Sequence, residues 1–555
     1  MTPKTPPGFR DILPEEAQAR ERISDRVKTT FAAHRYLPVE TPLLEMRSTF
    51  EQAGHIDNLP FQLFDAENSQ ILALRPDLTL PIARMVATHK SRRDFPLRLR
   101  YTAPVMREQA DLKGQPRQFT QLGVELIGGE DGRAEPEVVS LLAETLDALH
   151  VPAWHIVLGS VMPLKALLEA CAPTQAFTDR VLQLVHASDL VGLDELIDCV
   201  GFSQEVAQAL HGFPRLTGGI EALDQLDQVL DAAGVDTDKR GVQELRELAN
   251  ELKPLVDQRK LLFDFSIVNS FDYYTGIIFK AYSEDITASL ASGGRYDAVL
   301  THFGMPDTCA CGFALSLERL QEVLGEMGDT GVVTPADSSE NRPLRIAIPK
   351  GSLFPDTVKL LKAAGMPTDK LMDPGRHLII HEDGVDYIIV RAQDAPYFVG
   401  YGGADCGICG NDSIIESEVD LLQLVNLKYG ACRFVVAEPA ANKGKTDWAY
   451  AWRGYERVAT KYPHITQGYY DRIGRQVEIL PLHGNIELGP IVGMADRIVD
   501  ITATGTTLRE NDLVVVDDVL NCSARFFAGP AAYRCDTRIQ KLEERLRACV
   551  EKEKA

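Results

Sequence analysis

A change of composition near the middle of the chain divides the sequence into two long parts. Residues 325–343 are rich in Gly, Pro and Ser, carry several acidic residues and show no hydrophobic periodicity. Such a composition is typical of a linker between domains. The chain has 555 residues, whereas a single domain usually has about 150. We therefore expect residues 1–325 and 344–555 to fold separately, joined by a linker at 326–343.

The most informative local motif lies near the end of the chain, at Thr502–Leu508, with the sequence Thr-Ala-Thr-Gly-Thr-Thr-Leu. The preceding run, Ala495–Ile501, is apolar enough to predict a strand. Gly505 permits a positive φ, and successive N–H groups with threonine hydroxyls are suited to binding a phosphate. A strand followed by an ordinary Thr- and Gly-rich turn is the alternative. The motif alone does not decide between the two.

Composition excludes several classes of function. The net charge of −22 argues against a broad binding surface for RNA or DNA. No apolar run approaches the roughly 18 residues of a membrane span, and the N-terminal residues do not resemble a signal peptide. The ten cysteines are scattered, as in proteins of a reducing cytoplasm. We expect a cytoplasmic protein that does not bind a membrane, although a local nucleic-acid-binding patch is compatible with this net charge.

Several motifs occur in order in the first part. They are Gly8-Phe-Arg-Asp-Ile-Leu-Pro14, Gln121-Leu-Gly-Val-Glu-Leu-Ile-Gly128, Phe271-Asp-Tyr-Tyr-Thr-Gly276, Ser292-Gly-Gly-Arg-Tyr-Asp297 and Leu315-Ser-Leu-Glu-Arg-Leu320. Together they resemble the catalytic domain of class II aminoacyl-tRNA synthetases, the histidyl-tRNA synthetases in particular. The resemblance implies an α+β fold, with an antiparallel sheet of six or seven strands flanked by helices and a pocket for histidine.

The resemblance also implies which polar residues would hold free histidine. They are Asp77, Thr79, Arg107, Gln121, Glu125, Tyr273 and Tyr274. Asp77 and Glu125 are suited to the ammonium and imidazole N–H groups, and Arg107 is suited to the carboxylate. A site built from buried polar groups is selective, because a wrong ligand leaves some of them unpaired.

Some residues that synthetases use to activate their amino acid with ATP are missing from these motifs. The second synthetase motif reads Arg107-Glu-Gln109, and Gln115 stands where a later arginine is expected. Asn269 replaces another expected arginine, while Arg319 is retained, which leaves some nucleotide affinity open. Loss of two cations removes much of the charge that would stabilise an acyl-adenylate. The first part therefore resembles a histidine-sensing relative that does not aminoacylate, the regulatory subunit of ATP phosphoribosyltransferase. This resemblance implies that the chain does not bind tRNA. Residues 156–255, rich in helix-forming sequence, are predicted to be a helical insertion without chemistry.

The second part has a different set of motifs. They are Arg345-Ile-Ala-Ile-Pro-Lys-Gly351, Arg391-Ala-Gln-Asp394, Gly403-Ala-Asp-Cys-Gly-Ile-Cys-Gly-Asn-Asp412, Arg457-Val-Ala-Thr-Lys-Tyr-Pro463 and His483-Gly-Asn-Ile-Glu487, followed by the loop described above. Short strands alternating with helices predict an α/β fold. The motifs resemble the short form of the ATP phosphoribosyltransferase catalytic subunit, which implies a two-lobed fold similar to periplasmic binding proteins.

The implied reaction joins ATP N1 to C1 of phosphoribosyl pyrophosphate and releases pyrophosphate. Lys350, Arg376 and Arg391 are candidates for neutralising the leaving group together with substrate-bound Mg²⁺, although no metal ligand from the protein is assigned. Glu487 and Asp500 are candidates for positioning the ribose or the metal. The predicted 5′-phosphate site consists of Asp500, Thr502, Ala503, Thr504, Gly505, Thr506, Thr507 and Leu508.

The leading hypothesis is a fusion, natural or engineered, of a histidine-sensing domain with an ATP phosphoribosyltransferase that histidine inhibits. The related separate subunits form a hetero-octamer, so a homotetramer is the expected assembly. A working histidyl-tRNA synthetase with an appended domain, and a non-catalytic sensor of histidine and phosphorylated ligands, are the alternatives.

Two further sequence patterns each allow two interpretations. Cys406-Gly-Ile-Cys409 has the spacing of a redox motif, but it lies inside a family motif and is interpreted as packing. Ile539, Leu542, Leu546 and Val550 form an apolar stripe on a charged C-terminal helix. Such a stripe fits an oligomer or domain contact and an ordinary core equally well.

Overall fold

The computed structural model describes residues 5–51, 61–89, 94–108, 116–129, 134–171, 174–267, 273–325, 342–502 and 505–552. The chain forms two compact units. The first comprises Met1–Asn341 with Pro530–Asp536, and the second comprises Arg342–Gly529 with Thr537–Ala555. Most of the predicted linker, residues 326–341, lies outside the described residues. The described chain resumes at Arg342, which pairs with Asp405 at 2.9 Å inside the second unit.

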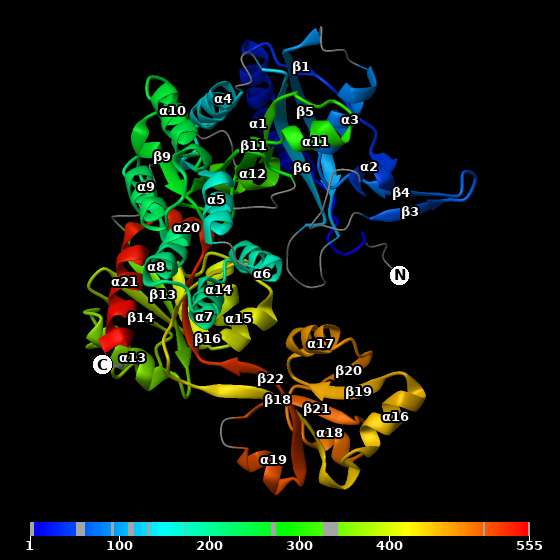
Figure 1. The fold of residues 1–555 in the computed structure, drawn as a ribbon, viewed down its shortest axis with the longest axis vertical. Helices are drawn as coiled ribbons and strands as arrows, with labels where there is room; N and C mark the ends of the chain where they lie inside the picture. The colour runs from blue at the N-terminus through cyan, green and yellow to red at the C-terminus, as the bar shows by residue number, and fades with distance from the viewer. Residues whose placement is uncertain are drawn as a thin grey trace. The chain divides into compact units, whose positions relative to one another are not determined.

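A large sheet forms the centre of the first unit (Figure 1). In its spatial order, the described strands are β1 (Leu37–Pro38), β5 (Leu97–Met106), β6 (Gln118–Ile127), β12 (Ala310–Ser316), β11 (Ala291–Arg295), β10 (Ile277–Ser283), β7 (Trp154–Ser160), β9 (Leu261–Asp264) and β8 (Thr217–Gly218). The sheet is mainly antiparallel, but β1 pairs with β5 and β7 with β9 in parallel. It exceeds the expected six or seven strands because β1 and β8 have two residues each, too few to show an alternating pattern.

A smaller sheet adds to the first unit, with the described order β2 (Leu44–Met46), β4 (Gln70–Leu74) and β3 (Gln62–Asp65). The helices of this unit within the described residues are α1 (Pro14–Ala33), α2 (Arg47–Glu51), α3 (Thr79–His89), α4 (Glu135–Ala148), α5 (Met162–Cys171), α6 (Gln175–His186), α7 (Leu190–Val200), α8 (Gln204–Gly212), α9 (Ala222–Ala232), α10 (Val242–Leu252), α11 (Asp297–His302), α12 (Leu317–Leu324) and α20 (Pro530–Cys535). Residues 156–255 are mostly helical, but the segment begins within β7 and contains β8.

Helix α1 shows how sequence sets local structure here. Pro14 occupies the first helical position, where its missing N–H costs nothing, and Glu15 and Glu16 lie in the first turn. Ile23, Val27 and Phe31 recur every four residues and are buried. The helix therefore covers the sheet with one apolar face.

Helix α20 belongs to the first unit although it follows β23 in the chain. Ala531 is buried in the main hydrophobic core of that unit. Arg534 donates from Nε to Asp264 Oδ2 at 2.5 Å and lies over the Tyr282 ring at 5.5 Å. Asp264 is 1% exposed. A segment from near the end of the sequence thus completes the core of the first unit.

The second unit contains two sheets. The order in the first sheet is β14 (Ile379–Glu382), β15 (Val385–Arg391), β13 (Leu344–Lys350), β16 (Cys406–Gly410), β23 (Ala524–Ala528) and β17 (Leu422–Asn426). The order in the second is β20 (Val477–Pro481), β19 (Glu456–Thr460), β21 (Arg497–Thr502), β18 (Cys432–Pro439) and β22 (Leu513–Cys522). Both orders refer to the described residues. Each sheet mixes parallel and antiparallel pairs, as expected for an α/β unit with returning strands.

The described helices of the second unit are α13 (Phe354–Ala363), α14 (Ala395–Gly400), α15 (Asn411–Ser417), α16 (Lys445–Arg453), α17 (Pro463–Arg472), α18 (Leu488–Ile491), α19 (Thr506–Glu510) and α21 (Thr537–Lys552). The apolar stripe of α21 is buried against α13 and β17. Of the two interpretations of that stripe, the structure supports ordinary core.

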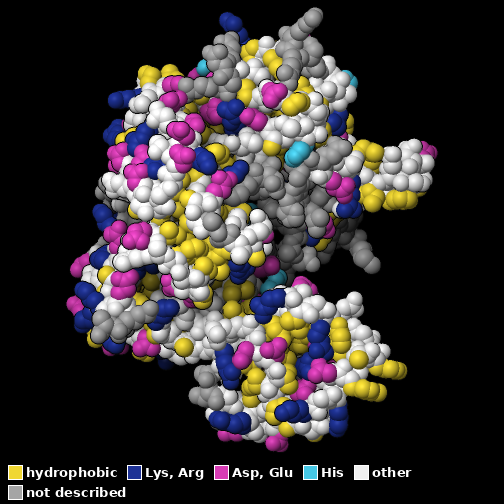
Figure 2. Space-filling model, in the orientation of Figure 1, with side chains coloured by type: hydrophobic (Ala, Val, Ile, Leu, Met, Phe, Trp, Pro, Cys, Tyr) yellow, Lys and Arg dark blue, Asp and Glu magenta, His cyan; other side chains and the backbone are white. Residues whose placement is uncertain are grey.

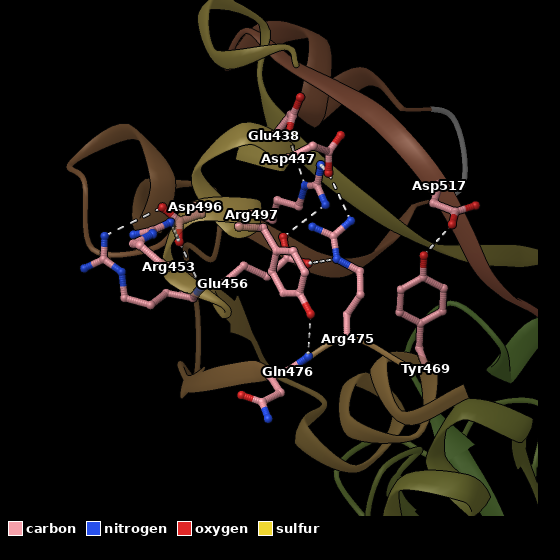
Figure 3. A network of polar contacts seen from close by, with 12 residues as sticks. Glu438, Asp447, Arg453, Glu456, Tyr469, Arg475, Gln476, Asp496, Arg497 and Asp517 are labelled. Carbon is pink, nitrogen blue, oxygen red and sulfur yellow. Dashed lines mark hydrogen bonds and ion pairs between the residues drawn. The ribbon is translucent and has the colours of Figure 1, made fainter. Parts of the chain in front are cut away.

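A buried ion-pair network fixes the strand that leads to the predicted phosphate loop (Figure 3). Arg497 on β21 binds Glu438 on β18 at 3.0 Å and Glu456 on β19 at 3.0 Å. Its third partner is Asp447 on α16, at 2.9 Å. Glu438 and Glu456 are 1% and 0% exposed, so their charges need compensation inside the protein. Arg497 supplies it for Glu438, whereas Glu456 also pairs with Arg475 at 3.2 Å. The network holds β21 in the centre of its sheet.

Candidate functional site

Two predicted cations lie side by side in the second unit. Lys350 ends β13 and Arg391 ends β15, and these parallel strands place the two residues directly opposite each other. Both side chains are exposed. Neither has an ion-pair partner among the described residues. The carboxyl edge of this sheet therefore presents two uncompensated positive charges, as a polyphosphate site requires. Arg376 is also exposed, in the turn between α13 and β14, but no contact joins it to this pair.

The predicted phosphate loop follows β21 as expected. Thr502 ends the strand, and its hydroxyl accepts the Gly505 N–H at 2.9 Å. Gly505 has φ +71°, the left-handed conformation that favours glycine. Helix α19 begins at Thr506, and Leu508 is buried beneath the loop. Ala503 and Thr504 lie outside the described residues. Thr507 falls in the first turn of α19, and the Thr506 hydroxyl accepts from Arg509 at 3.3 Å.

Acidic groups gather beside that loop. The pKa of Asp500 is raised from 3.8 to about 6. Burial is the largest cause and the nearby Glu487 carboxylate adds to it, whereas the Ile501 N–H and Lys461 act in the opposite direction. Glu487 immediately precedes α18, so it reaches Asp500 from a different element. The structure thus brings together both acids that the sequence predicted.

Lys461 and Asp412 extend this group. Burial raises the pKa of Asp412, and Lys461 again lowers it. A Cβ at Gly410 would lie 2.1 Å from Asp412 Oδ1, so a larger residue there would displace the Asp412 carboxylate. Asp412 belongs to α15 beside the first sheet, whereas Lys461 follows β19 of the second. The sequence motifs contained both residues, but nothing in their spacing showed that one lysine would face two acids from different segments.

Residues from the two sheets also meet directly. The Gln393 side chain donates to the Tyr462 hydroxyl at 3.5 Å. Glu416 on α15 accepts the backbone N–H groups of His464 and Ile465, at 3.1 and 3.0 Å, at the start of α17. These contacts place the motif residues of the two sheets near one another within the second unit.

Glu125 is the centre of the predicted histidine site in the first unit. It lies on β6, is 1% exposed, and accepts hydrogen bonds from Thr79 at 2.8 Å and Tyr296 at 2.5 Å. Tyr101 donates a longer bond, 3.4 Å. Gly312 lies opposite on β12, where a Cβ would come within 1.9 Å of Glu125 Oε2. We call Asp77, Thr79, Tyr101, Arg107, Gln121, Glu125, Tyr273, Tyr274 and Tyr296 the Glu125 cluster.

The ionisable side chains of the Glu125 cluster are buried away from water. Burial raises the pKa of Glu125 from 4.5 to about 7. It also raises the pKa of Asp77 and lowers that of Arg107. In each case burial disfavours the charged form. A ligand that carries both an ammonium and a carboxylate would compensate all three groups.

The remaining cluster residues supply hydrogen-bonding groups and walls. The Gln121 side-chain oxygen is buried and has no partner among the described residues, so it is open to a ligand N–H. The Tyr273 and Tyr274 rings contact each other at 4.8 Å, and Tyr273 lies 6.4 Å from the Tyr296 ring. Arg107 donates to the Pro76 carbonyl at 3.1 Å and lies over Phe119 at 4.9 Å. The structure therefore groups the predicted residues around one carboxylate.

Comparison with known proteins assigns a family to each part. The histidyl-tRNA synthetase family model matches residues 8–320. The ATP phosphoribosyltransferase model matches residues 391–548. An ATP phosphoribosyltransferase of Rubrobacter xylanophilus is 46% identical over 193 residues, which is 35% of this chain and 89% of the relative. The chain belongs to the ATP phosphoribosyltransferase family.

The first part matches the other subunit of that family. An ATP phosphoribosyltransferase regulatory subunit of Moorella thermoacetica is 35% identical over 324 residues, 58% of this chain and 82% of the relative. A crystal structure from Bacillus halodurans, titled as an ATP phosphoribosyltransferase regulatory subunit/histidyl-tRNA synthetase, has 27% identity and a TM-score of 0.54. It covers 70% of this chain and 99% of its own. The predicted fusion of catalytic and regulatory parts, and the class II synthetase-like fold of the first, are confirmed.

Some predicted features of this ATP phosphoribosyltransferase fall outside the described residues, namely Gln109, Gln115 and Asn269. Arg319 is described, and its guanidinium donates to the Ser289 carbonyl at 2.6 Å. Burial lowers its pKa.

Tyr296 was missed as a candidate site residue, although it stands in the quoted Ser292–Asp297 motif. Its partner Glu125 is 171 residues away in sequence, so only the folded sheet shows the contact.

Neither a metal-binding cluster nor a membrane-spanning helix occurs among the described residues. No group of three His, Cys, Asp or Glu side chains has the arrangement of a metal site in that part of the chain. No described helix is long and apolar enough to cross a membrane. On the face drawn in Figure 2, basic and acidic side chains are interspersed among apolar ones.

Proposed function

We propose that the second unit transfers the phosphoribosyl group of phosphoribosyl pyrophosphate to N1 of ATP, the first step of histidine synthesis, and that histidine bound in the first unit slows this transfer. The observation that carries the proposal is the grouping of Asp412, Lys461 and Asp500 beside the loop that starts at Thr502. These residues come from three motifs and converge where a phosphorylated sugar would lie.

The reaction needs substrate alignment and charge compensation rather than a covalent intermediate. N1 of the adenine attacks C1 of the ribose, and the bond from C1 to the pyrophosphate oxygen breaks. Lys350 and Arg391 lie side by side and are suited to the negative charge that develops on the leaving group. Holding both substrates in line supplies much of the acceleration.

The loop and its acids would hold the ribose phosphate. The N–H groups that follow Thr502, with the hydroxyls of the loop, are suited to the 5′-phosphate. Mg²⁺ in such enzymes is commonly held by one or two carboxylates together with substrate phosphates. Glu487 lies close enough to Asp500 to raise the pKa of that carboxyl, and the two acids fit that role. The ion would act as a Lewis acid on the pyrophosphate oxygens.

Histidine would bind at the Glu125 cluster. Glu125 and Asp77 would accept the ammonium or imidazole N–H groups, Arg107 would bind the carboxylate, and the unpaired Gln121 oxygen would accept a further N–H. A coupling free energy of about 1–3 kcal/mol between this ligand and the reaction would be typical of allosteric enzymes. We further propose a two-lobed arrangement of the second unit and a homotetramer. The scattered, unpaired cysteines support a reducing, cytoplasmic location.

The test measures pyrophosphate release by the whole chain with ATP, phosphoribosyl pyrophosphate and Mg²⁺, with and without histidine. We expect turnover that histidine suppresses. Glu125→Gln is expected to keep turnover and lose suppression. Glu137→Gln is the matched control, because this carboxylate binds Arg98 and Tyr36 at a different place in the first unit, and suppression should survive.

Two results would contradict the proposal. Absence of turnover in the wild-type chain would remove the catalytic assignment. Histidine suppression that persists in Glu125→Gln would remove the assignment of the Glu125 cluster. Histidine-dependent exchange between ATP and pyrophosphate, measured in the same preparation, would instead support a working synthetase.

A further inference from the structure

The chain passes between the two sheets of the second unit at two described places, and a cysteine stands at each. The first passage runs from β17 to β18, which begins at Cys432. The second runs from β22, which ends at Cys522, to β23. Any movement of one sheet relative to the other must be accommodated at these two passages.

The two cysteines are direct partners. In the antiparallel pairing of β18 with β22, Cys432 lies opposite Cys522, at the end of the ladder. Opposed residues in such a pair bring their Cβ atoms to about 4.5–5.5 Å, and a disulfide needs about 3.5–4.5 Å. Both cysteines are in the thiol form, Cys432 half-buried and Cys522 buried. A small inward shift of either strand end would allow the bond to form.

The pKa values of the two thiols are shifted in opposite directions. A hydrogen bond with the Cys522 thiol lowers the pKa of Cys432. The same contact, with burial, raises the pKa of Cys522. The more accessible sulfur therefore has the greater thiolate character, which is the property of an attacking cysteine.

The other close pair in the sequence lacks this geometry. Cys406 and Cys409 stand three positions apart on β16, and both are fully buried. Residues at odd spacing on a strand point to opposite faces of the sheet. Their redox-motif spacing therefore does not bring the sulfurs together, in agreement with the interpretation as packing.

We propose that Cys432 and Cys522 are a redox modification site, in which a reversible disulfide joins the two passages between the sheets and slows turnover. Hydrogen peroxide is the proposed oxidant class. The Cys432 thiolate attacks a peroxide oxygen, the O–O bond breaks, and Cys432 becomes a sulfenic acid with release of water. The Cys522 thiol then attacks that sulfur, and the S–S bond forms with loss of a second water. In sum, the two thiols are oxidised by two electrons and one peroxide is reduced to two waters.

The site lies against the candidate catalytic residues. Asp412 acts electrostatically on both cysteines. Its neighbour Asn411 exchanges backbone and side-chain hydrogen bonds with Ser523, at 3.1 and 3.0 Å, directly after Cys522. Ser523 also donates to Asn426 at 2.9 Å, at the end of β17. A bond across the passages would therefore restrain the segment that positions Asp412.

The effect on turnover rests on the proposed function, whereas formation of the disulfide does not. The whole chain is treated with equimolar hydrogen peroxide, remaining thiols are alkylated, and the digest is mapped by mass spectrometry under non-reducing conditions. We expect a crosslinked peptide pair containing Cys432 and Cys522, which dithiothreitol reverses. Cys432→Ser should abolish it, whereas Cys171→Ser, at a half-buried cysteine of the first unit, should leave it intact.

Pyrophosphate release is measured on the same samples. Oxidation is expected to slow turnover on the order of tenfold, because misplacement of a positioning group by a fraction of an ångström is costly. Dithiothreitol should restore the rate, and Cys432→Ser should be insensitive to peroxide. Amide exchange at residues 427–431 should slow on oxidation.

Failure of the redox site and failure of the proposed function give different results. Absence of the Cys432–Cys522 crosslink, or a crosslink that leaves both turnover and amide exchange unchanged, overturns the inference. If the reduced chain has no turnover but the crosslink forms and exchange slows, the proposed function fails while the redox site stands.

Discussion

Glu125 is a carboxylate that destabilises the folded chain when it is charged. Burial raises its pKa from 4.5 to about 7. Between these two values the unfolded chain releases the proton while the folded chain keeps it, so the free energy of unfolding falls as the pH rises. The loss is complete above pH 7 and amounts to about 3 kcal/mol. A protein retains such a group when ligand binding needs its charge.

This cost predicts a stabilising substitution. Glu125→Gln removes the charge and keeps an oxygen that can accept from Thr79. We expect the variant to melt at a higher temperature than the wild type at pH 8. At pH 4.5 the two should melt at nearly the same temperature, because the carboxyl is protonated in the folded wild type and half protonated in the unfolded chain. Calorimetry across this pH range checks the prediction. A difference that does not depend on pH would contradict it.

The raised pKa of Asp500 predicts that activity, rather than stability, depends on pH. Its pKa is raised to about 6, chiefly by burial. If its carboxylate holds ribose or Mg²⁺, kcat/KM for phosphoribosyl pyrophosphate should fall about tenfold per pH unit below pH 6. Asp500→Asn should lower the rate and remove this limb of the profile. An unchanged limb in the variant would assign it to another group.

At the level of elements, the Arg497 network predicts how β21 depends on its neighbours. Arg497→Met leaves Glu438 buried without a cation and Glu456 with Arg475 alone, and a buried carboxylate without its cation typically costs about 3–5 kcal/mol. The loss should shrink as the pH falls, because protonation removes the uncompensated charges. Urea denaturation at pH 8 and pH 5 measures this. Arg453→Met is the control, since its partner Asp496 is partly exposed and should cost less. Equal losses would contradict a special role for the network.

Strand patterns and turn chemistry could be predicted from the sequence, because they depend on neighbouring residues. The apolar run before Thr502 predicted β21, and Gly505 adopts the expected positive φ. Contacts across elements could not be predicted in the same way. Tyr296 meets Glu125 only because β11 and β6 both flank β12, and Lys461 meets two acids only when the motifs of both sheets converge. The resemblance to known families supplied the site residues that local patterns lack.

At the level of the whole molecule, α20 makes the first unit depend on a segment near the end of the chain. Arg534→Met leaves Asp264, 1% exposed, without its cation. We expect loss of about 3 kcal/mol from the first unit, seen as a lower midpoint for the calorimetric transition that histidine shifts. Arg433→Met is the control, because its ion pair with Asp518 is exposed and should change little. An unaffected histidine-shifted transition would mean that α20 does not support this unit.

The position of α20 also has a consequence for biosynthesis. During translation, residues 1–341 leave the ribosome long before Pro530–Asp536, so the nascent first unit lacks part of its core until nearly the whole polypeptide has been made. In the second unit, α20 separates Arg342–Gly529 from Thr537–Ala555 in the sequence, although α20 itself packs in the first unit. Cutting the gene at the linker into two open reading frames would therefore leave the first product without α20. The two units are linked by this exchanged segment as well as by the peptide bond at the linker.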